Sequence, residues 1–237
     1  MSDRLKGRIA LVTGASQGIG AAIAKAYAKQ GAHVILVARN QKKLEAVDDE
    51  IKQAGGEATL LPLDLMNFEE VDKIGPSIHE KFDKLDIFVG NAGLLGTLGP
   101  LHQISSREFD HVMGVNVTAN FRLIKTLDPL LQISDAGRVI FVSTGSGVVK
   151  GRAYWGTYSV SKAALESMAR VYADENRQTN LRVNLVDPGT VRTDMRASAV
   201  PGEDPMSLPH PDDITGAFID LAVSDCQKQG EIVQLRA

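Results

Sequence analysis

The sequence is poor in cysteine, in long apolar runs and in excess charge of either sign. Its one cysteine, Cys226, cannot form an internal disulfide, which is typical of proteins from a reducing compartment. No run approaches the ~18 apolar residues of a membrane-spanning helix, and the apolar run at 9–12 is shorter than the roughly seven residues of a secretory signal. The net charge of −3 lacks the basic excess typical of nucleic-acid binding. We therefore expect a cytoplasmic protein without a membrane or nucleic-acid partner.

The sequence instead alternates short apolar runs with longer helical patterns. Several of the runs are rich in Val, Ile and Leu without polar alternation, which is typical of parallel strands covered on both faces. We predict seven strands, at 9–13, 33–38, 58–63, 85–90, 138–143, 182–186 and 231–235. The 237 residues are enough for one large α/β domain, and the alternation predicts a doubly wound parallel sheet flanked by helices.

The segments between the predicted strands carry apolar residues at helical spacing. The two longest candidate helices span 105–133 and 159–179, and Gly75-Pro76 is expected to interrupt a helix that begins near Phe68. The segment 190–211 contains four prolines and fits no regular element. Because it follows the carboxyl end of a strand, where ligands of open α/β sheets bind, we expect a substrate lid there, with a solvated loop as the alternative.

A glycine-rich loop runs from Thr13 to Gly20, between the first strand and the first helix. Backbone N–H groups at a helix N-terminus can approach a diphosphate only where no Cβ intervenes, which explains a need for glycine. The context predicts the dinucleotide site of a single Rossmann domain spanning residues 1–237, and the alternative is a purely structural turn. The predicted contacts from this loop are Gly14, Ser16, Gln17, Gly18, Ile19 and Gly20.

The second predicted strand ends at an arginine. An acidic residue at this position would bond the ribose 2′-hydroxyl and select NAD, but the sequence has Arg39 instead. A guanidinium suits a 2′-phosphate. We therefore predict NADP(H) as the preferred cofactor, with NAD(H) possible; the alternative interpretation of Arg39 is a solvated arginine at a strand end.

Tyr158 and Lys162 lie four residues apart in a predicted helix, and hence on one face. A free phenol has a pKa of about 10, too high for efficient proton transfer at neutral pH. We expect the neighbouring ammonium to lower the pKa of Tyr158. A surface pair at the same spacing is the alternative.

Together these motifs make the chain resemble the short-chain dehydrogenase/reductases, from about Gly7 to Val223. The glycine loop matches the cofactor motif of that family, and Asn91-Ala92-Gly93 matches its N-A-G element. The resemblance implies further cofactor contacts from the ends of later strands. These contacts are Asp64, Leu65, Asn91, Ala92, Gly93, Pro188, Gly189, Val191 and Thr193, together with Tyr158 and Lys162.

The resemblance also implies a catalytic tetrad. Tyr158 would act as general acid or base, Lys162 would hold the nicotinamide ribose and lower the pKa of the tyrosine, and Asn116 would hold a water of the proton relay. The fourth member departs from the family, because Thr144 stands where the family usually has a serine. Its hydroxyl can bond a substrate oxygen as that of serine does. Ser146 is the rival, and Ser143 a more distant one.

The implied activity is an NADP(H)-dependent oxidoreductase that moves a hydride between nicotinamide and a carbonyl or alcohol substrate, without a metal. Association through the two long helices into a homodimer or homotetramer is also implied. The runs 152–156 and 192–197 are similar to a bacterial subgroup related to the YciK proteins. A non-catalytic dinucleotide-binding sensor or scaffold is the alternative, and its one sequence hint is Thr144.

Overall fold

One parallel sheet organises the molecule. The computed structural model describes residues 3–235, and its seven strands follow the order β3-β2-β1-β4-β5-β6-β7. They are β1 (Ile9–Thr13), β2 (His33–Ala38), β3 (Glu57–Pro62), β4 (Ile87–Gly90), β5 (Arg138–Val142), β6 (Arg182–Asp187) and β7 (Ile232–Gln234). All seven predicted strands and the predicted doubly wound sheet are confirmed. The winding reverses between β1 and β4, and the crevice at such a switch point is where open α/β sheets bind ligands.

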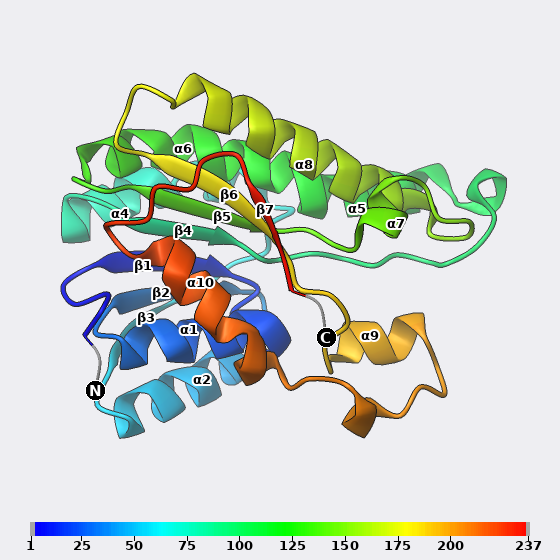
Figure 1. The fold of residues 1–237 in the computed structure, drawn as a ribbon, viewed down its shortest axis with the longest axis horizontal. Helices are drawn as coiled ribbons and strands as arrows, with labels where there is room; N and C mark the ends of the chain where they lie inside the picture. Colours follow the sequence, from blue (N-terminus) through cyan, green and yellow to red (C-terminus); the bar gives the residue numbers. More distant parts are fainter. Residues whose placement is uncertain (1–2, 236–237) are drawn as a thin grey trace.

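Helices cover both faces of this sheet (Figure 1). On one face lie α1 (Gly18–Lys29), α2 (Gln41–Gln53) and α10 (Thr215–Ala222). On the other lie α3 (Phe68–Asp72), α4 (Ile74–Phe82), α5 (Ser106–Met113), α6 (Ala119–Ile133) and α8 (Gly156–Glu175). Shorter elements are the 3₁₀ turn η1 (Leu101–Gln103), the π-helical turn η2 (Gly114–Thr118) and α7 (Ser146–Val149).

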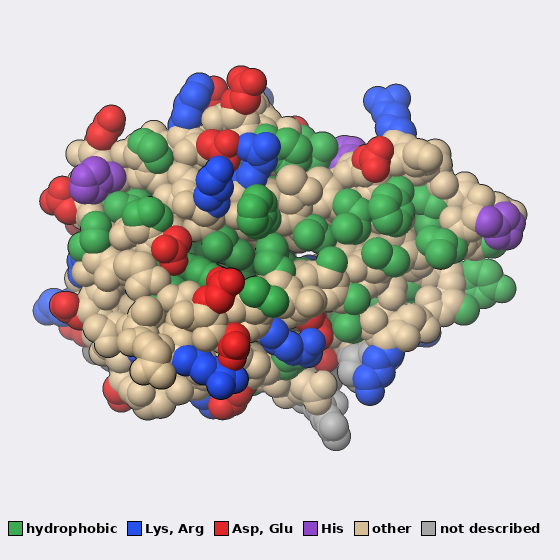
Figure 2. All heavy atoms as spheres, turned by 90° about the horizontal axis from the view of Figure 1, so that it is seen from above, with side chains coloured by type: hydrophobic (Ala, Val, Ile, Leu, Met, Phe, Trp, Pro, Cys, Tyr) green, Lys and Arg blue, Asp and Glu red, His purple; other side chains and the backbone are tan. Residues whose placement is uncertain are grey.

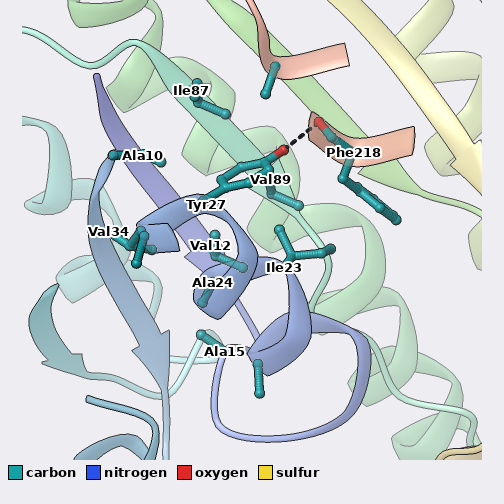
Figure 3. Packing of buried hydrophobic residues seen from close by; sticks show 14 of the residues in the cluster. Ala10, Val12, Ala15, Ile23, Ala24, Tyr27, Val34, Ile87, Val89 and Phe218 are labelled. Atoms are coloured by element: carbon teal, nitrogen blue, oxygen red, sulfur yellow. Dashed lines mark hydrogen bonds between the residues drawn. The ribbon is translucent and has the colours of Figure 1, made fainter. Parts of the chain in front are cut away.

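The two faces bury separate hydrophobic clusters. Along β1, Ala10 and Val12 point into one cluster and Leu11 into the other, as the twofold alternation of a strand requires. Figure 3 shows Tyr27 of α1 packed among apolar side chains of the first cluster, with its hydroxyl donating to the Phe218 carbonyl oxygen at 2.9 Å. Burial of both faces explains why the strands are apolar without alternation.

The predicted helices differ from the observed ones in informative places. The path from 106 to 133 is helical throughout but contains the π-helical turn η2, which its sequence does not reveal. The second long helix begins earlier than expected, at Gly156, and ends at Glu175, where the side-chain amide of Asn176 donates to the Tyr172 carbonyl oxygen and satisfies the last turn. The break near Gly75-Pro76 falls at Lys73, and Pro76 occupies the first turn of α4, where no N–H is needed.

The segment 190–211 is irregular only in part, which corrects the expectation that it fits no regular element. It contains α9 (Asp194–Ala199) and the 3₁₀ turn η3 (Pro205–Ser207), and a second turn, η4 (Pro211–Ile214), follows. Thr193 caps α9 by accepting the Arg196 N–H at 3.1 Å, and proline takes the first position of both turns. The capping threonine and the prolines at first helical positions are visible in the sequence. Four prolines in one segment nevertheless favoured the prediction of an irregular loop. In residues 3–235, no helix is long and apolar enough to cross a bilayer.

Candidate functional site

The carboxyl ends of strands β1 to β6 border one cleft of about 830 Å³, a size typical of cofactor and substrate sites. All of the predicted site residues line this cleft except Gly20 and Asn116, which lie behind its wall. Residues up to 179 positions apart, from Gly14 to Thr193, are brought together because parallel strands end at the same edge of the sheet.

The glycine loop has the shape that a diphosphate requires. Gly14 and Gly18 adopt positive φ angles of 67° and 56°, which favour glycine strongly. A Cβ on Gly20 would overlap the Gly14 carbonyl oxygen and the Asn91 side-chain nitrogen. The N-terminus of α1 therefore opens onto a cradle that side chains would fill, and the residues present fit a bound dinucleotide.

Asn91 and Ala92 form hydrogen bonds directly with the last residue of β1, Thr13. The Thr13 hydroxyl oxygen accepts the N–H groups of both residues at 3.0 Å, and the Asn91 side-chain amide donates to the Thr13 carbonyl oxygen at 2.8 Å. The buried Thr13 thus holds the N-A-G element against the glycine loop across the switch point. Sequence reasoning included Thr13 in the motif but assigned it no role, although a hydroxyl at a strand end was the available signal.

The far end of the cleft is positively charged. The Arg39 side chain is 61% exposed, and its guanidinium lies 4.0 Å from the half-exposed carboxylate of Asp64, a loose contact. Lys43 of α2 also lines the cleft, and its ammonium donates to the side-chain oxygen of Gln17. Both cations can reach a phosphate monoester there. Lys43 was missed, because only the fold brings the first turn of α2 to the glycine loop.

Tyr158 and Lys162 lie one turn apart on α8, with only 7% and 3% of their surfaces exposed. The Lys162 ammonium lies 5.7 Å from the centroid of the tyrosine ring and donates to the Val142 carbonyl oxygen at 2.7 Å. Burial lowers the pKa of Lys162 to about 8, against an opposing effect of the Glu166 charge. This pair is buried and adjoins the cleft, so it is not a solvated surface pair.

The pKa of Tyr158 moves in the direction opposite to the expected one. Burial raises the pKa of the phenol, a hydrogen bond with the Thr144 side chain lowers it, and the Asp187 charge raises it. The expectation of a lowered Tyr158 pKa is therefore wrong for the protein alone. The physical reason is that the phenolate loses more hydration by burial than it gains from its neighbours.

Asn116 is fully buried in the π-helical turn and holds two segments together. Its side-chain oxygen accepts the Leu94 N–H at 2.7 Å, and its amide nitrogen donates to the Leu94 carbonyl oxygen and to the Ser161 hydroxyl, both at 2.9 Å. The Ser161 hydroxyl in turn donates to the Tyr158 carbonyl oxygen at 2.8 Å. Asn116 thus connects the loop after β4 to the turn of α8 that carries Tyr158, and Ser161 is a member that sequence reasoning missed.

The structure separates two of the three candidate hydroxyls. Thr144 lines the cleft together with Tyr158, and its side chain is near enough to lower the pKa of the phenol. The Ser143 hydroxyl instead donates to the buried carboxylate of Glu166 at 2.5 Å, so it is engaged away from the tyrosine. The side chain of Ser146 lies outside the described part of the structure.

Known proteins are similar to this chain in sequence and fold. The short chain dehydrogenase family matches residues 8–204. The oxidoreductase YciK of Escherichia coli K12 is 44% identical over 230 residues, which cover 96% of this chain and 90% of that protein. A short chain dehydrogenase from Shigella flexneri 2a, solved with NADP, superposes with a TM-score of 0.94 at 42% identity over 99% of both chains. One from Escherichia coli CFT073, solved with NADPH, has a TM-score of 0.93 at 43% identity over 98% of both chains.

The family match covers most of the chain, and the similarity to YciK extends over nearly all of it. The residues of the family's motifs are those that the fold gathers around the cleft. The chain therefore belongs to the short-chain dehydrogenase/reductase family of NAD(P)-dependent oxidoreductases.

Proposed function

We propose that this protein transfers a hydride between NADP(H) and a carbonyl or alcohol substrate, with Tyr158 as general acid in reduction and general base in oxidation. The observation that carries the proposal is the buried Tyr158, one helical turn from Lys162, which lines the same cleft as Thr144 and the glycine loop. The relatives solved with NADP and NADPH support the cofactor preference, as does Arg39 at the far end of the cleft.

When bound, the nicotinamide supplies or accepts the hydride. The hydroxyls of Thr144 and Tyr158 donate to the substrate oxygen where negative charge develops, a contribution typically worth a few kcal/mol of barrier. Because its pKa is raised, Tyr158 is a neutral phenol at neutral pH and is ready to donate its proton in the direction of reduction. Lys162 would hold the nicotinamide ribose. Asn116 would hold the water of the proton relay that serves Tyr158.

To test this proposal, the enzyme is incubated with NADPH and each member of a panel of aldehydes and ketones. The rate of NADPH consumption is measured from the fall in its absorbance. Turnover of any panel carbonyl, faster with NADPH than with NADH, supports hydride transfer by this site. Tight binding of NADPH without turnover of any carbonyl or alcohol would instead favour the sensor or scaffold, since the fold permits both.

Replacing Arg39 by alanine is expected to weaken NADPH binding about 10- to 100-fold, because a charge-assisted hydrogen bond contributes roughly 1.5–3 kcal/mol. NADH has no 2′-phosphate, so its dissociation constant is expected to change by less than about twofold. Titration of the intrinsic fluorescence with each cofactor measures both constants, and NADH is the built-in control. Equal losses for the two cofactors would show that Arg39 does not recognise the phosphate.

The segment 190–211 is proposed to act as a lid over the substrate. Its base touches the cofactor loop, since a Cβ on Gly18 would lie 3.4 Å from the Thr193 methyl group. The two ends of the segment are joined by a hydrogen bond, in which the Arg192 N–H donates to the Pro209 carbonyl oxygen at 3.0 Å. Within it, the Arg196 guanidinium makes a bidentate pair with Glu203, both bonds at 2.6 Å. A segment with this internal structure can move as a unit.

The proposed assembly is a homodimer or homotetramer in the cytoplasm. Figure 2 shows hydrophobic side chains gathered on the face that carries α8, and Phe121 of α6 and Val171 of α8 are each 56% exposed. Light scattering after size exclusion should give two or four chains for the wild type and one chain for Phe121→Glu/Val171→Glu. The matched change Leu101→Glu, outside these helices, should leave the mass unchanged. An oligomer that survives the double substitution would place the interface elsewhere.

A further inference from the structure

Two consecutive residues at the end of β5, Val142 and Ser143, form hydrogen bonds with side chains of α8. The Lys162 ammonium donates to the Val142 carbonyl oxygen at 2.7 Å. One turn further along α8, the carboxylate of Glu166 accepts the Ser143 hydroxyl at 2.5 Å. Thr144 follows Ser143 directly. The position of the Thr144 hydroxyl relative to Lys162 therefore depends on both of these hydrogen bonds.

Glu166 is a buried carboxylate that does not line the cleft; 5% of its surface is exposed. Its second oxygen lies 3.0 Å from the guanidinium of Arg170, whose side chain is half exposed. Burying a carboxylate costs free energy, and an apolar side chain of similar volume often fills such a space with equal or greater stability. Packing alone therefore does not account for a charge at this position.

The charge of Glu166 acts on Lys162 as well as on Ser143. The charged and titratable groups around Lys162 are Tyr158 and Glu166 on its own helix and Asp187 at the end of β6. The end of β5 that contacts Lys162 and the π-helical turn contribute neutral groups, and Arg138 lies at the opposite end of β5. Burial lowers the pKa of Lys162 to about 8, and Glu166 opposes this shift. Loss of the Glu166 charge should therefore lower the pKa of Lys162 further and deplete the ammonium form near neutral pH.

We propose that Glu166 is a positioning residue, which holds the Thr144 hydroxyl against α8 through Ser143 and keeps Lys162 beside it. The inference rests on the proposed roles of Thr144 and Lys162. It assigns Glu166 an effect mainly on kcat, because the carboxylate reaches neither the glycine loop nor the cleft and acts on the cofactor only through Lys162. A misplacement of about 1 Å in a reacting group can cost roughly 100-fold in rate.

The test compares Glu166→Met, which leaves no acceptor for the Ser143 hydroxyl, with Ser143→Ala and the double variant, using NADPH and whichever panel carbonyl the wild type reduces. Each single variant should lower kcat by about 10-fold or more, and the double variant should be no slower than the slower single one, because both remove one linkage. In Ser143→Ala, which leaves the charge of Lys162 unchanged, the dissociation constant of NADPH should stay within about twofold of the wild type. The matched control is Asp48→Asn on α2, another buried carboxylate, 6% exposed, with a basic partner four residues on; it should leave kcat unchanged.

A second measurement needs no substrate. NMR titration of lysine labelled at its ε-carbon should give a lower pKa for Lys162 in Glu166→Gln than in the wild type. Additive effects on kcat, an unchanged Lys162 titration in Glu166→Gln, or a parallel loss of NADPH affinity in Ser143→Ala would each overturn the assignment. If the wild type turns over no carbonyl, the proposed function fails instead, so the two failures are distinguishable.

Discussion

Tyr158→Phe is expected to lower kcat about a thousandfold, within the range that general acid–base catalysis contributes. Under the proposed mechanism, the variant loses both the proton that Tyr158 donates and one of the two hydroxyls that donate to the substrate oxygen. The aromatic ring that packs beside Lys162 and Trp155 remains. We therefore expect the dissociation constant of NADPH to change by less than about twofold. Steady-state rates with the best carbonyl of the panel, together with fluorescence titration of NADPH, measure the two quantities separately.

The matched control is Tyr154→Phe. Tyr154 lies four residues before Tyr158, is 65% exposed and has no assigned role in the chemistry. Its variant should keep wild-type kcat. Activity of Tyr158→Phe at a tenth of the wild-type level or above would mean that another group donates the proton, and the proposed mechanism would be wrong.

Gly20→Ala is expected to have the second largest effect, a loss of NADPH affinity of about 100-fold or more. The new Cβ would overlap the Gly14 carbonyl oxygen and the Asn91 side-chain nitrogen, so either the glycine loop or the N-A-G element must move. Both line the cofactor end of the cleft. Inserting a carbon into a tightly packed site also costs about 1–3 kcal/mol of stability, which corresponds to a fall in Tm of roughly 5 °C for a chain of this size.

Thermal unfolding with and without NADPH tests both parts of that prediction. The stabilisation that NADPH confers on the wild type should be nearly absent in Gly20→Ala. The matched control is Gly216→Ala in α10, where the added Cβ meets nothing within 4 Å and alanine favours the helix. Its Tm should stay the same or rise. A normal response of Gly20→Ala to NADPH would show that the loop does not contact the cofactor.

The strands were predictable because their apolar composition reports burial on both faces, which is a local property of each run. The cofactor loop was predictable because its glycines and the following helix are contiguous in the chain. The linkage of Ser143 to Glu166 joins residues 23 positions apart, and no local pattern reveals it. The direction of the Tyr158 pKa shift was missed for a similar reason, because burial depends on elements that the chain supplies elsewhere.

The cleft takes residues from the ends of six strands, and its lining extends from Gly14 to Pro211. A partly folded chain that lacks any of these strands cannot present the complete site, so the cofactor binds only the fully paired sheet. Binding energy then adds to the free energy of unfolding of the whole domain, by about 2.7 kcal/mol when the cofactor is at a hundred times its dissociation constant. The cellular supply of dinucleotide would therefore influence how long the protein survives proteolysis, in addition to how fast it works.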